Sequence, residues 1–414
     1  PMWLNGYGNR NKPSEGKLHD LWVKAIALED TNGKTAVAVH ADLLGIPKEV
    51  YDSLCKKIEA KTGLGRDDLM LTVTHTHTGP VLAKALSDLF VLDAEQQKRV
   101  DDYTDELETM IVDTVVKAMA DRKPATLWAG QGATDFAVNR RNNSEAQVPK
   151  IRKAGGKLKG PVDHDVPVLA VRAPDGKLRA VFCGYACHST TLSYYKWAGD
   201  YSGFTQIALE KNHPGAQAMF FIGCGADQNP IPRRSEKLCE KYGHMLAKAV
   251  EDVLAKPMRP VVPKLKTAYE QISLAYGSQP GKADLAKRAK ADNYQGRRAK
   301  RMLAMLEAGK KFPKTYEGYP IQAWKLGDEQ LWITMGGEVV VDYALKFKGI
   351  YGKNTWITGY ANDCMSYIPS DRVRKEGGYE AAAFHVYGLP ADTWAPGIEE
   401  KITACVDRLV KQVN

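Results

Sequence analysis

Two histidines that lie two positions apart are the residues with the clearest potential for chemistry. His75 and His77 belong to the segment Thr74–Pro80 (THTHTGP), which directly follows the apolar run LMLTV. Residues two apart on an extended chain point to the same side, so we expect both imidazoles to face one pocket where a strand ends. A single histidine is more often a hydrogen-bonded residue without a chemical role. The paired spacing, the flanking threonines and the Gly-Pro turn favour a functional site.

Two further segments place polar side chains directly after an apolar run. Tyr185–Thr191 (YACHSTT) carries His188, although a buried neutral histidine bonded to a neighbouring hydroxyl explains this segment equally well. Gly223–Pro230 (GCGADQNP) follows AMFFI, and its glycines and Asx residues predict a sharp bend with exposed backbone N–H groups. A plain turn after a strand is an equal alternative for this second segment. Neither segment alone indicates a functional site, so each is interpreted together with the other polar segments.

A carboxylate and several phenols form the fourth group. Glu338 follows LWITM and two glycines, and Tyr360–Tyr367 lies further along the chain. A lone Glu after Gly-Gly is most often an acid stabilised by a helix dipole. Together, however, the four groups supply histidines, a carboxylate and phenols at strand ends, where α/β sheets assemble their sites. Imidazole and carboxylate suit Zn²⁺, which polarises a carbonyl and lowers the pKa of bound water to roughly 7. This chemistry favours hydrolysis of an amide or ester.

The elements that must position these groups follow from the hydrophobic periodicity. Strands are predicted at 35–40, 69–74, 166–171, 180–185 and 218–222. Helices are predicted at 47–61, 97–120 and 235–255. A polar segment rich in Lys and Gly, 142–160, is predicted to be a surface loop. Because strands and helices interleave, we predict an α/β fold of mixed α and β layers, with mixed sheets flanked by helices and a metal site at strand ends.

Composition excludes several classes of protein. The chain has 414 residues, of which 44% are hydrophobic and 26% are charged, so it can bury a core and is not predominantly disordered. Its 36 glycines exclude a collagen-like chain, and its seven cysteines form no CxxC pair, which argues against a cysteine zinc site. No run approaches the roughly 18 apolar residues that a membrane span needs, and no transmembrane segment is predicted. One domain over residues 1–414 is favoured over two because no linker separates the halves.

The net charge of +9 is concentrated in one segment. Residues 282–314 contain eleven Lys or Arg and three Asp or Glu, and they read as a helical hairpin interrupted near Gly296. Two interpretations stay open: a solvated helix face, or a patch that meets an anionic substrate or makes peripheral contact with membrane headgroups. A third, binding of nucleic acid, has only charge in its favour. Because no nucleic-acid motif or regular aromatic interleaving is present, we predict no nucleic-acid partner.

Several short motifs in register resemble those of the neutral (non-lysosomal) ceramidase family. The segments HTHTGP, YACHSTT, GCGADQNP, GGE and SYIPSDRVRKEGGYEAAA occur in the family's order, as do LNGYG at 4–8 and the pair Asn139-Arg140. The similarity extends from about residue 2 to about residue 400. The resemblance implies a zinc site whose ligands are His75, His188, Glu338 and Tyr367. It implies catalytic or substrate-contacting roles for His77, Arg140, Tyr379 and Gly6, and beside these we place Asp227 as an orienting residue and Arg141 and Gln228 as substrate-binding residues.

Two departures from the family pattern change what is expected. The family turn is of the Gly-Asp-Val-Ser-Pro-Asn type, and Gln228 stands where its serine would be. Glutamine cannot form an acyl-enzyme, so direct attack by zinc-bound water is the simpler mechanism. Ceramide-cleaving members carry an additional C-terminal sandwich domain, which we do not expect in this chain. The bond cleaved therefore need not be in ceramide.

The sequence thus predicts a zinc-dependent amidohydrolase that cleaves an amide (N-acyl) or ester bond of a small-molecule or lipid-like substrate. The alternative is a catalytically silent protein that keeps the fold and the metal to bind a ligand. Because members of the family are commonly exported, the resemblance implies a secreted or periplasmic location. The chain shows no apolar signal core after Pro1, so we expect any signal peptide to have been removed.

Overall fold

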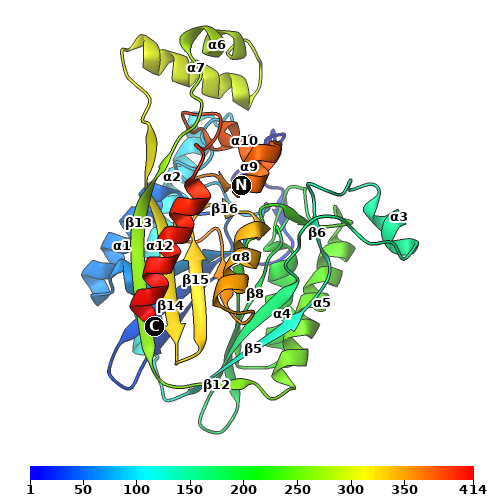
Figure 1. Ribbon diagram of the computed structural model, residues 1–414, viewed down its shortest axis with the longest axis vertical. Coiled ribbons are helices and arrows are strands. Elements are labelled where there is room, and N and C mark those ends of the chain that lie inside the picture. Colours follow the sequence, from blue (N-terminus) through cyan, green and yellow to red (C-terminus); the bar gives the residue numbers. More distant parts are fainter.

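A mixed five-stranded sheet forms the centre of the computed structural model, which describes residues 1–414 (Figure 1). Its strand order is β10-β8-β7-β5-β12; β8 and β10 run parallel and the other pairs are antiparallel. Parallel neighbours end at the same edge of a sheet, so the segments that follow β8 and β10 emerge side by side. The strands are β5 (Thr126–Ala133), β7 (Asp165–Arg172), β8 (Leu178–Tyr185), β10 (Gln217–Ile222) and β12 (Arg259–Val261).

A second, three-stranded sheet lies against the first and delivers the paired histidines. Its order is β2-β3-β4; β3 and β4 are parallel and are joined by the crossover helix α1. Strand β4 contacts β10 of the central sheet, so Thr74–Pro80 leaves its strand close to the ends of β8 and β10. The elements are β2 (Val23–Glu29), β3 (Thr35–Ala41), β4 (Leu69–Val73), α1 (Lys48–Thr62), η1 (Arg66–Asp68) and α2 (Ala94–Ala120).

A third sheet, in the order β13-β14-β15-β17, carries the segment that contains Glu338. Strands β13, β14 and β15 are antiparallel, and β17 pairs with β15 in parallel. Helix α12 packs on β13 and β14. The elements are β13 (Leu265–Ala275), β14 (Thr315–Leu326), β15 (Gln330–Met335), β17 (Trp356–Thr358), α8 (Val341–Tyr351) and α12 (Ile398–Val413).

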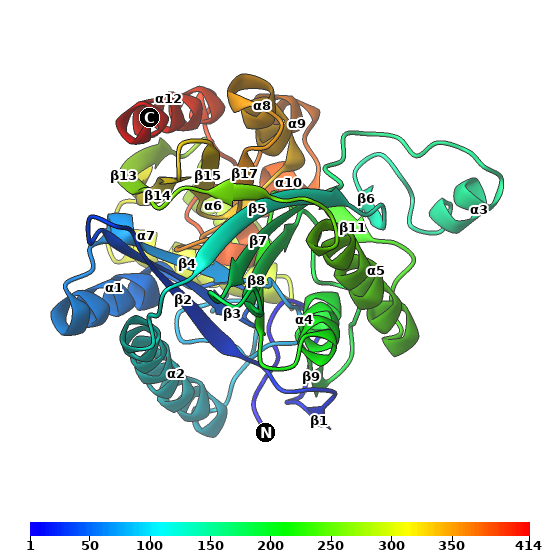
Figure 2. The same ribbon diagram turned by 90° about the horizontal axis from the view of Figure 1, so that it is seen from below.

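Helices cover the outer faces of the sheets. Seen from below (Figure 2), α1 and α2 flank the β2-β3-β4 sheet, α4 and α5 flank the central sheet, and α8 and α12 lie outside the third. The bounds are α4 (Asp200–Asn212) and α5 (Glu236–Leu254). This arrangement confirms the predicted α/β class with mixed sheets between helices. No helix of the structure has the length and apolar character needed to cross a membrane.

The predicted elements agree with the observed ones to within three residues, and the differences have local causes. Helix α2 begins three residues earlier than predicted because Asp93 accepts a hydrogen bond from the Gln96 backbone N–H and caps the helix. Helix α1 ends where Gly63 adopts a left-handed conformation, with φ of 75°. All seven cysteines are buried and free, and they pack in the core as small hydrophobic residues.

Short elements build the loops around the sheets. The two-residue strands β16 and β18 pair with each other, as do β6 with β11 and β1 with β9. The predicted loop 142–160 projects from the body and contains the short helix α3 (Figure 2). The bounds are β1 (Gly16–Lys17), β6 (Ala137–Asn139), α3 (Val148–Lys153), β9 (Lys196–Trp197), β11 (Gln228–Pro230), β16 (Glu338–Val339), β18 (Tyr367–Ile368), α9 (Asp371–Glu376), α10 (Tyr379–Ala382) and α11 (Phe384–Tyr387).

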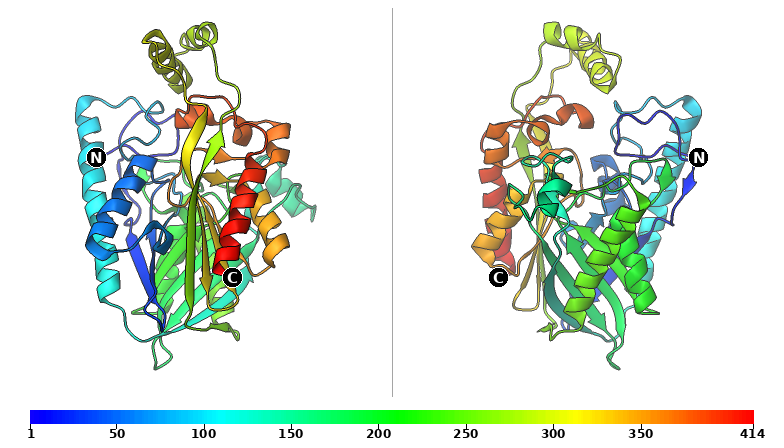
Figure 3. Two further views of the ribbon diagram at one scale, coloured as in Figure 1. Left: turned by 60° about the vertical axis from the view of Figure 1, so that its left-hand side comes forward. Right: turned by 90° about the vertical axis from the view of Figure 1, so that its right-hand side faces the viewer.

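Two helices occupy the segment that was predicted to be a basic hairpin. Helices α6 (Lys282–Arg288) and α7 (Tyr294–Glu307) pack against each other and are inserted between β13 and β14. Asn293 caps α7 by accepting a hydrogen bond from the Gly296 backbone N–H. The hairpin extends beyond the end of the third sheet in Figure 1 and in both views of Figure 3.

Candidate metal centre

Three histidines from two sheets converge on one point. His75 and His77 follow β4 and His188 follows β8, and the nearest ligand atoms of all three lie within 4.8 Å of one another. The Nε2 atoms of His75 and His77 are 3.2 Å apart. His75 adopts a positive φ of 55°, a sparsely populated conformation for a residue with a side chain. The two imidazoles that the spacing predicted to face one pocket lie beside each other at this point.

Backbone carbonyls fix the tautomers of two of these rings. Nδ1 of His75 lies 2.6 Å from the Leu44 carbonyl oxygen, and Nδ1 of His188 lies 2.7 Å from that of Gly225. A carbonyl only accepts hydrogen bonds, so each Nδ1 carries the proton and each Nε2 keeps a free lone pair. These lone pairs face the cluster. Histidines that bind metals commonly have this second hydrogen bond.

Glu338 completes the cluster with an oxygen that has no hydrogen-bond partner. Its Oε2 lies 3.4 Å from Nε2 of His75 and 3.1 Å from Nε2 of His188, and it is buried without a hydrogen bond. Its other oxygen accepts a hydrogen bond from the hydroxyl of Tyr387. An unsatisfied buried carboxylate oxygen beside imidazole lone pairs fits a bound cation, since buried polar atoms otherwise find partners.

The protonation states suit metal ligands. Burial and the charge of Arg140 lower the pKa of His188 to about 4. Burial and the neighbouring His75 hold the pKa of His77 well below its usual value. Burial raises the pKa of Glu338, but His75 and His188 outweigh it and hold this pKa well below the usual value. Neutral imidazoles and an ionised carboxylate are the forms that bind metals.

Tyr367 is brought to the cluster by the pairing of two very short strands. In the parallel β16–β18 pair, Glu338 lies opposite Tyr367. The Tyr367 hydroxyl is 3.5 Å from Nε2 of His188 and accepts a hydrogen bond of 3.2 Å from Nη2 of Arg140. All four residues named as ligands from the resemblance therefore lie together. His77 is a further nitrogen donor at the same point.

The N-terminal segment packs directly on His77. Gly6 has a φ of +97°, and a Cβ at this position would lie 2.4 Å from Nδ1 of His77. The ring of Tyr7 lies 4.8 Å from the His77 ring, measured between centroids. Only glycine allows the chain to pass this close to the imidazole. Gly6 thus lies beside the cluster.

Arg140 and Arg141 share one buried carboxylate, Glu380. Arg140 Nε lies 2.8 Å from one Glu380 oxygen and Arg141 Nη1 lies 2.6 Å from the other. The Arg140 guanidinium carbon is 5.5 Å from the centroid of the Tyr379 ring, whereas Arg141 turns outward to Glu376. Arg140 is thus the arginine that reaches the cluster. The sequence did not predict a role for Glu380, because no spacing pattern connects it to Arg140, which lies 240 positions earlier.

Asp227 and Gln228 hold backbone segments of the site in place. The Asp227 carboxylate accepts hydrogen bonds from the Val341 backbone N–H, 2.9 Å, and from Asn139 Nδ2, 3.2 Å. Its carbonyl accepts a hydrogen bond from the Arg140 backbone N–H. Gln228 is fully buried; its Nε2 donates to the Ala186 carbonyl. These contacts position the segments that carry Arg140 and His188.

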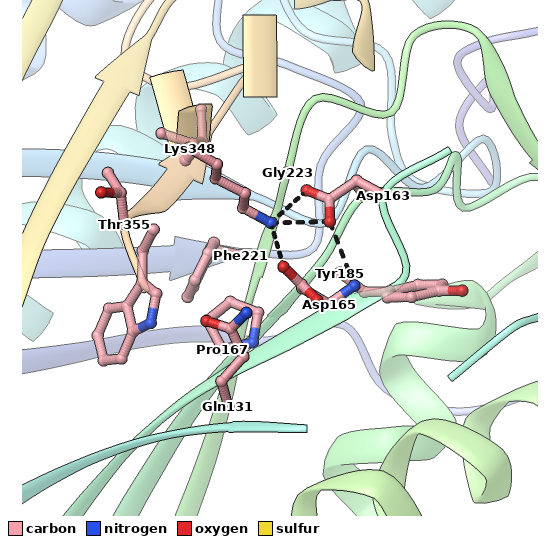
Figure 4. Close-up of a pocket in the computed structure, with 12 residues that line it drawn as sticks. Gln131, Asp163, Asp165, Pro167, Tyr185, Phe221, Gly223, Lys348 and Thr355 are labelled. Atoms are coloured by element: carbon pink, nitrogen blue, oxygen red, sulfur yellow. Dashed lines mark hydrogen bonds and ion pairs between the residues drawn. The ribbon is translucent and has the colours of Figure 1, made fainter. Parts of the chain in front are cut away.

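The Gln228 side chain also connects the site to an ion cluster. Its Oε1 accepts a hydrogen bond of 3.0 Å from the Asp163 backbone N–H. Figure 4 shows the Asp163 carboxylate facing Lys348 of α8, whose Nζ lies 2.7 Å from both Asp163 oxygens and 2.7 Å from Asp165. The cavity beside this cluster has a volume of only about 10 Å³. The ion cluster is therefore a structural link, and the cavity beside it is too small for a substrate.

Replacing Gln228 with serine is expected to lower stability and not to create a nucleophile. Serine is too short to keep both hydrogen bonds, so the Asp163 N–H and the Ala186 carbonyl lose their partner at a fully buried position. We expect the free energy of unfolding to fall by about 2–4 kcal/mol, measured by urea unfolding. Gln412→Ser, on the exposed end of α12, should change it by less than about 0.5 kcal/mol. A serine variant that is as stable as the parent would contradict this account.

A second, much larger cavity lies away from the histidines. It has a volume of about 1330 Å³ and lies between β2, the end of α2, β5 and β12. None of the residues predicted to form the site lines it. Its place near β12 is at the lower end of the molecule in Figure 1, opposite the basic hairpin. The groups that can perform chemistry therefore do not gather there.

Comparison with known proteins places the chain beside neutral ceramidases. The family model described as "Neutral/alkaline non-lysosomal ceramidase, N-terminal" matches residues 2–233. The neutral ceramidase of Pseudomonas aeruginosa is 28% identical over 195 residues, 46% of this chain and 28% of that protein. Neutral ceramidase A of Dictyostelium discoideum is 26% identical over 224 residues, 52% of this chain and 30% of that protein. The matches thus span less than a third of each relative.

Solved structures extend the likeness of the fold to nearly the whole chain. A ceramidase complexed with C2 superposes with a TM-score of 0.73 at 17% identity, covering 98% of this chain and 73% of that one. The crystal structure of neutral ceramidase from Pseudomonas aeruginosa gives a TM-score of 0.72 at 17% identity, covering 99% and 71%. The family match covers more than half of the sequence, and the fold agrees with it. The chain belongs to the neutral/alkaline non-lysosomal ceramidase family.

Proposed function

We propose that this protein is a zinc-dependent hydrolase that cleaves an amide (N-acyl) or ester bond. The observation that carries the proposal is the buried cluster in which the Nε2 atoms of His75 and His188 face the unpartnered Oε2 of Glu338. Membership of a ceramidase family supports hydrolysis as the class of reaction. The relatives are named neutral ceramidases, which supports a lipid-like N-acyl substrate, although the chain matches only part of each.

Zinc is the metal that these donors favour. Imidazole nitrogens with one carboxylate are typical of zinc sites, whereas Mg²⁺ and Ca²⁺ prefer oxygen ligands. His75, His188 and Glu338 would hold the ion, with the hydroxyl of Tyr367 and Nε2 of His77 as further donors at the same point. When bound, zinc supplies polarisation of a carbonyl oxygen and a lowered pKa, roughly 7, for water.

The remaining residues of the site would bind the substrate and move protons. His77 is neutral, and its buried Nδ1 has no hydrogen-bond partner, so it can accept a proton or donate to an oxyanion. Arg140 is fixed by Glu380 and can donate to a polar group of the substrate. Tyr379, a residue that is 48% exposed, lies beside this guanidinium and offers an aromatic surface to a substrate.

Gln228 separates this proposal from a serine mechanism. Its side chain contacts two backbone groups and cannot act as a nucleophile. Hydrolysis would therefore proceed without an acyl-enzyme. A secreted or periplasmic location is part of the same proposal, supported by the family resemblance.

Removal of the metal tests the proposal. Purified protein should contain close to one zinc per chain by elemental analysis, and it should release fatty acid from N-acyl substrates. A chelator should abolish this release, and Zn²⁺ but not Mg²⁺ should restore it, because the donor set favours zinc. Full activity without metal would contradict the mechanism. Bound zinc without turnover of any N-acyl or ester substrate would instead favour the catalytically silent binding protein.

A further inference from the structure

The basic hairpin formed by α6 and α7 has two sides of different chemistry. Its ion pairs are all made by arginines, which face the body of the protein. Its seven lysines are all exposed and make no ion pair. The two kinds of basic residue are therefore divided between a docking side and a solvent side. Lys282 and Lys287 lie on α6, Lys290 lies between the helices and Lys300 lies on α7, while Lys310, Lys311 and Lys314 lie in the segment that joins α7 to β14.

The arginines attach the hairpin to two loops. Arg288 makes a bidentate pair with Asp392, with distances of 2.8 and 2.9 Å. Arg298, which is 3% exposed, donates to the carbonyls of Leu389 and Ala391. The other loop is held by two more arginines, because Arg301 pairs with Asp88 and Arg297 donates to the backbone carbonyls of residues 88 and 89. Bidentate and carbonyl contacts of this kind fix geometry, so the hairpin is held in one orientation.

Two successive contacts connect the docking side of the hairpin to the metal cluster. Helix α7 packs against α11, and the ring of Tyr294 stacks on His385 with centroids 5.7 Å apart. Tyr387, at the end of α11, donates its hydroxyl hydrogen to Glu338. The hairpin therefore extends beyond the body above the segment that borders the cluster (Figures 1 and 3). A surface that binds the lysines would lie at this end of the molecule.

The solvent side has strong uncompensated charge and no apolar anchor. Of the three acidic residues of the hairpin, Asp284 pairs with Arg288, which leaves Asp292 and Glu307 against seven lysines. No large apolar side chain of the hairpin is exposed, because Leu285, Ala299 and Met302 form a small core of their own. Such a surface binds by charge and not by insertion. It also lacks the aromatic stacking platforms that bind single-stranded nucleic acids.

We infer that the lysine side of the α6–α7 hairpin binds the surface of anionic lipid bilayers and holds the end of the molecule near the metal cluster toward the membrane. Each lysine close to an anionic surface adds to the attraction, and several act together. Salt screens this attraction, because the Debye length is about 10 Å at 0.1 M ionic strength. The inference rests on the hairpin alone and does not require that the proposed hydrolysis occurs.

Flotation of the full-length chain with lipid vesicles tests this inference. We expect binding to vesicles of phosphatidylcholine mixed with phosphatidylglycerol, and little binding to phosphatidylcholine alone. Binding should fall more than about tenfold when the salt concentration is raised from about 50 to about 500 mM, because the Debye length shortens over this range. A variant that removes four lysine charges should lose about 100-fold or more in affinity. It carries Lys287→Gln, Lys290→Gln, Lys300→Gln and Lys311→Gln.

A matched variant removes the same charge from the body. Its four lysines are also exposed and without ion pairs, and they lie on α1, α4, α5 and after α8. It should lose less than about threefold in affinity for the vesicles, since these residues lie outside the hairpin that is inferred to bind the membrane. It carries Lys56→Gln, Lys211→Gln, Lys241→Gln and Lys353→Gln.

Three results would overturn the inference. They are equal binding to neutral and anionic vesicles, equal losses in the two lysine variants, and tighter binding to an oligonucleotide than to anionic vesicles at the same salt concentration. His188→Ala should bind vesicles as the parent chain does. Loss of hydrolysis with retained binding, or the reverse, therefore distinguishes failure of the proposed function from failure of this inference.

Discussion

Replacing His188 with alanine is expected to remove both the bound metal and the hydrolytic activity. The imidazole supplies one of the lone pairs that face Glu338, at 3.1 Å, and its Nδ1 is already fixed by the Gly225 carbonyl. Loss of an outer-shell hydrogen bond costs a metal site about 10–100-fold in affinity, so loss of the ligand itself should cost more than about 100-fold. Activity should fall by at least about 1000-fold, since the metal supplies several kcal/mol of transition-state stabilisation.

The measurement combines elemental analysis of zinc per chain with the release of fatty acid from an N-acyl substrate. His213→Ala is the matched control, because this histidine is partly exposed, pairs with Glu251 and lies outside the cluster. The control should keep both zinc and activity. A His188→Ala variant with normal zinc and normal turnover would show that the cluster is not the reacting centre.

The sequence was sufficient for the parts of the site that depend on strand ends. Runs of β-branched and other apolar residues predicted β4, β8 and β10 to within two residues, and the polar segments after them were expected to meet. They meet because β8 and β10 are parallel and β4 contacts β10. Local patterns carry this information, since buried strands have a strong hydrophobic signature.

Contacts between distant segments left no such signature. Glu338 and Tyr367 face each other through the two-residue strands β16 and β18, which are too short to show periodicity. The resemblance to the family implied that both residues are metal ligands. The residue patterns alone indicated only a single acidic residue after two glycines and a group of tyrosines. Tyr387, which donates to Glu338, was missed for the same reason. Tertiary packing decides such contacts.

Charge is the clearest case in which composition and structure say different things. The eleven basic residues of the hairpin look alike in the sequence, yet the structure divides them into docked arginines and exposed lysines. The choice of residue is chemically consistent, because a guanidinium makes bidentate pairs and an ammonium on a flexible chain remains solvated. Which side faces the body depends on Asp88 and Asp392, far away in the sequence. Net charge could not reveal that division.

Glu380→Gln is expected to destabilise the fold more than any nearby change of the same charge. The Glu380 side chain is 4% exposed and pairs with both Arg140, at 2.8 Å, and Arg141, at 2.6 Å. Loss of one partner from a buried pair leaves an uncompensated charge, which costs about 3–5 kcal/mol. We expect the free energy of unfolding, measured by urea unfolding, to fall by about 3 kcal/mol, at the lower end of this range because glutamine keeps the shape.

Glu376→Gln is the matched control for this prediction. It removes the same charge from the other carboxylate that pairs with Arg141, but this side chain is 42% exposed. Exposed ion pairs contribute less than about 1 kcal/mol, so the control should remain close to the parent chain. Equal losses in the two variants would show that burial of Glu380 is not what makes the pair important.

The same variant should also change catalysis in a way that stability alone does not. Glu380 holds the guanidinium of Arg140 against Tyr367 and Tyr379, so Glu380→Gln releases the group that would bind the substrate. A charged hydrogen bond contributes about 1.5 kcal/mol or more, and we therefore expect KM to rise about tenfold. Zinc content should stay at the parent level because Glu380 contacts none of the three histidines. If zinc content and kcat fell while KM stayed constant, Glu380 would be supporting the metal cluster, and Arg140 would not be the residue that it positions for the substrate.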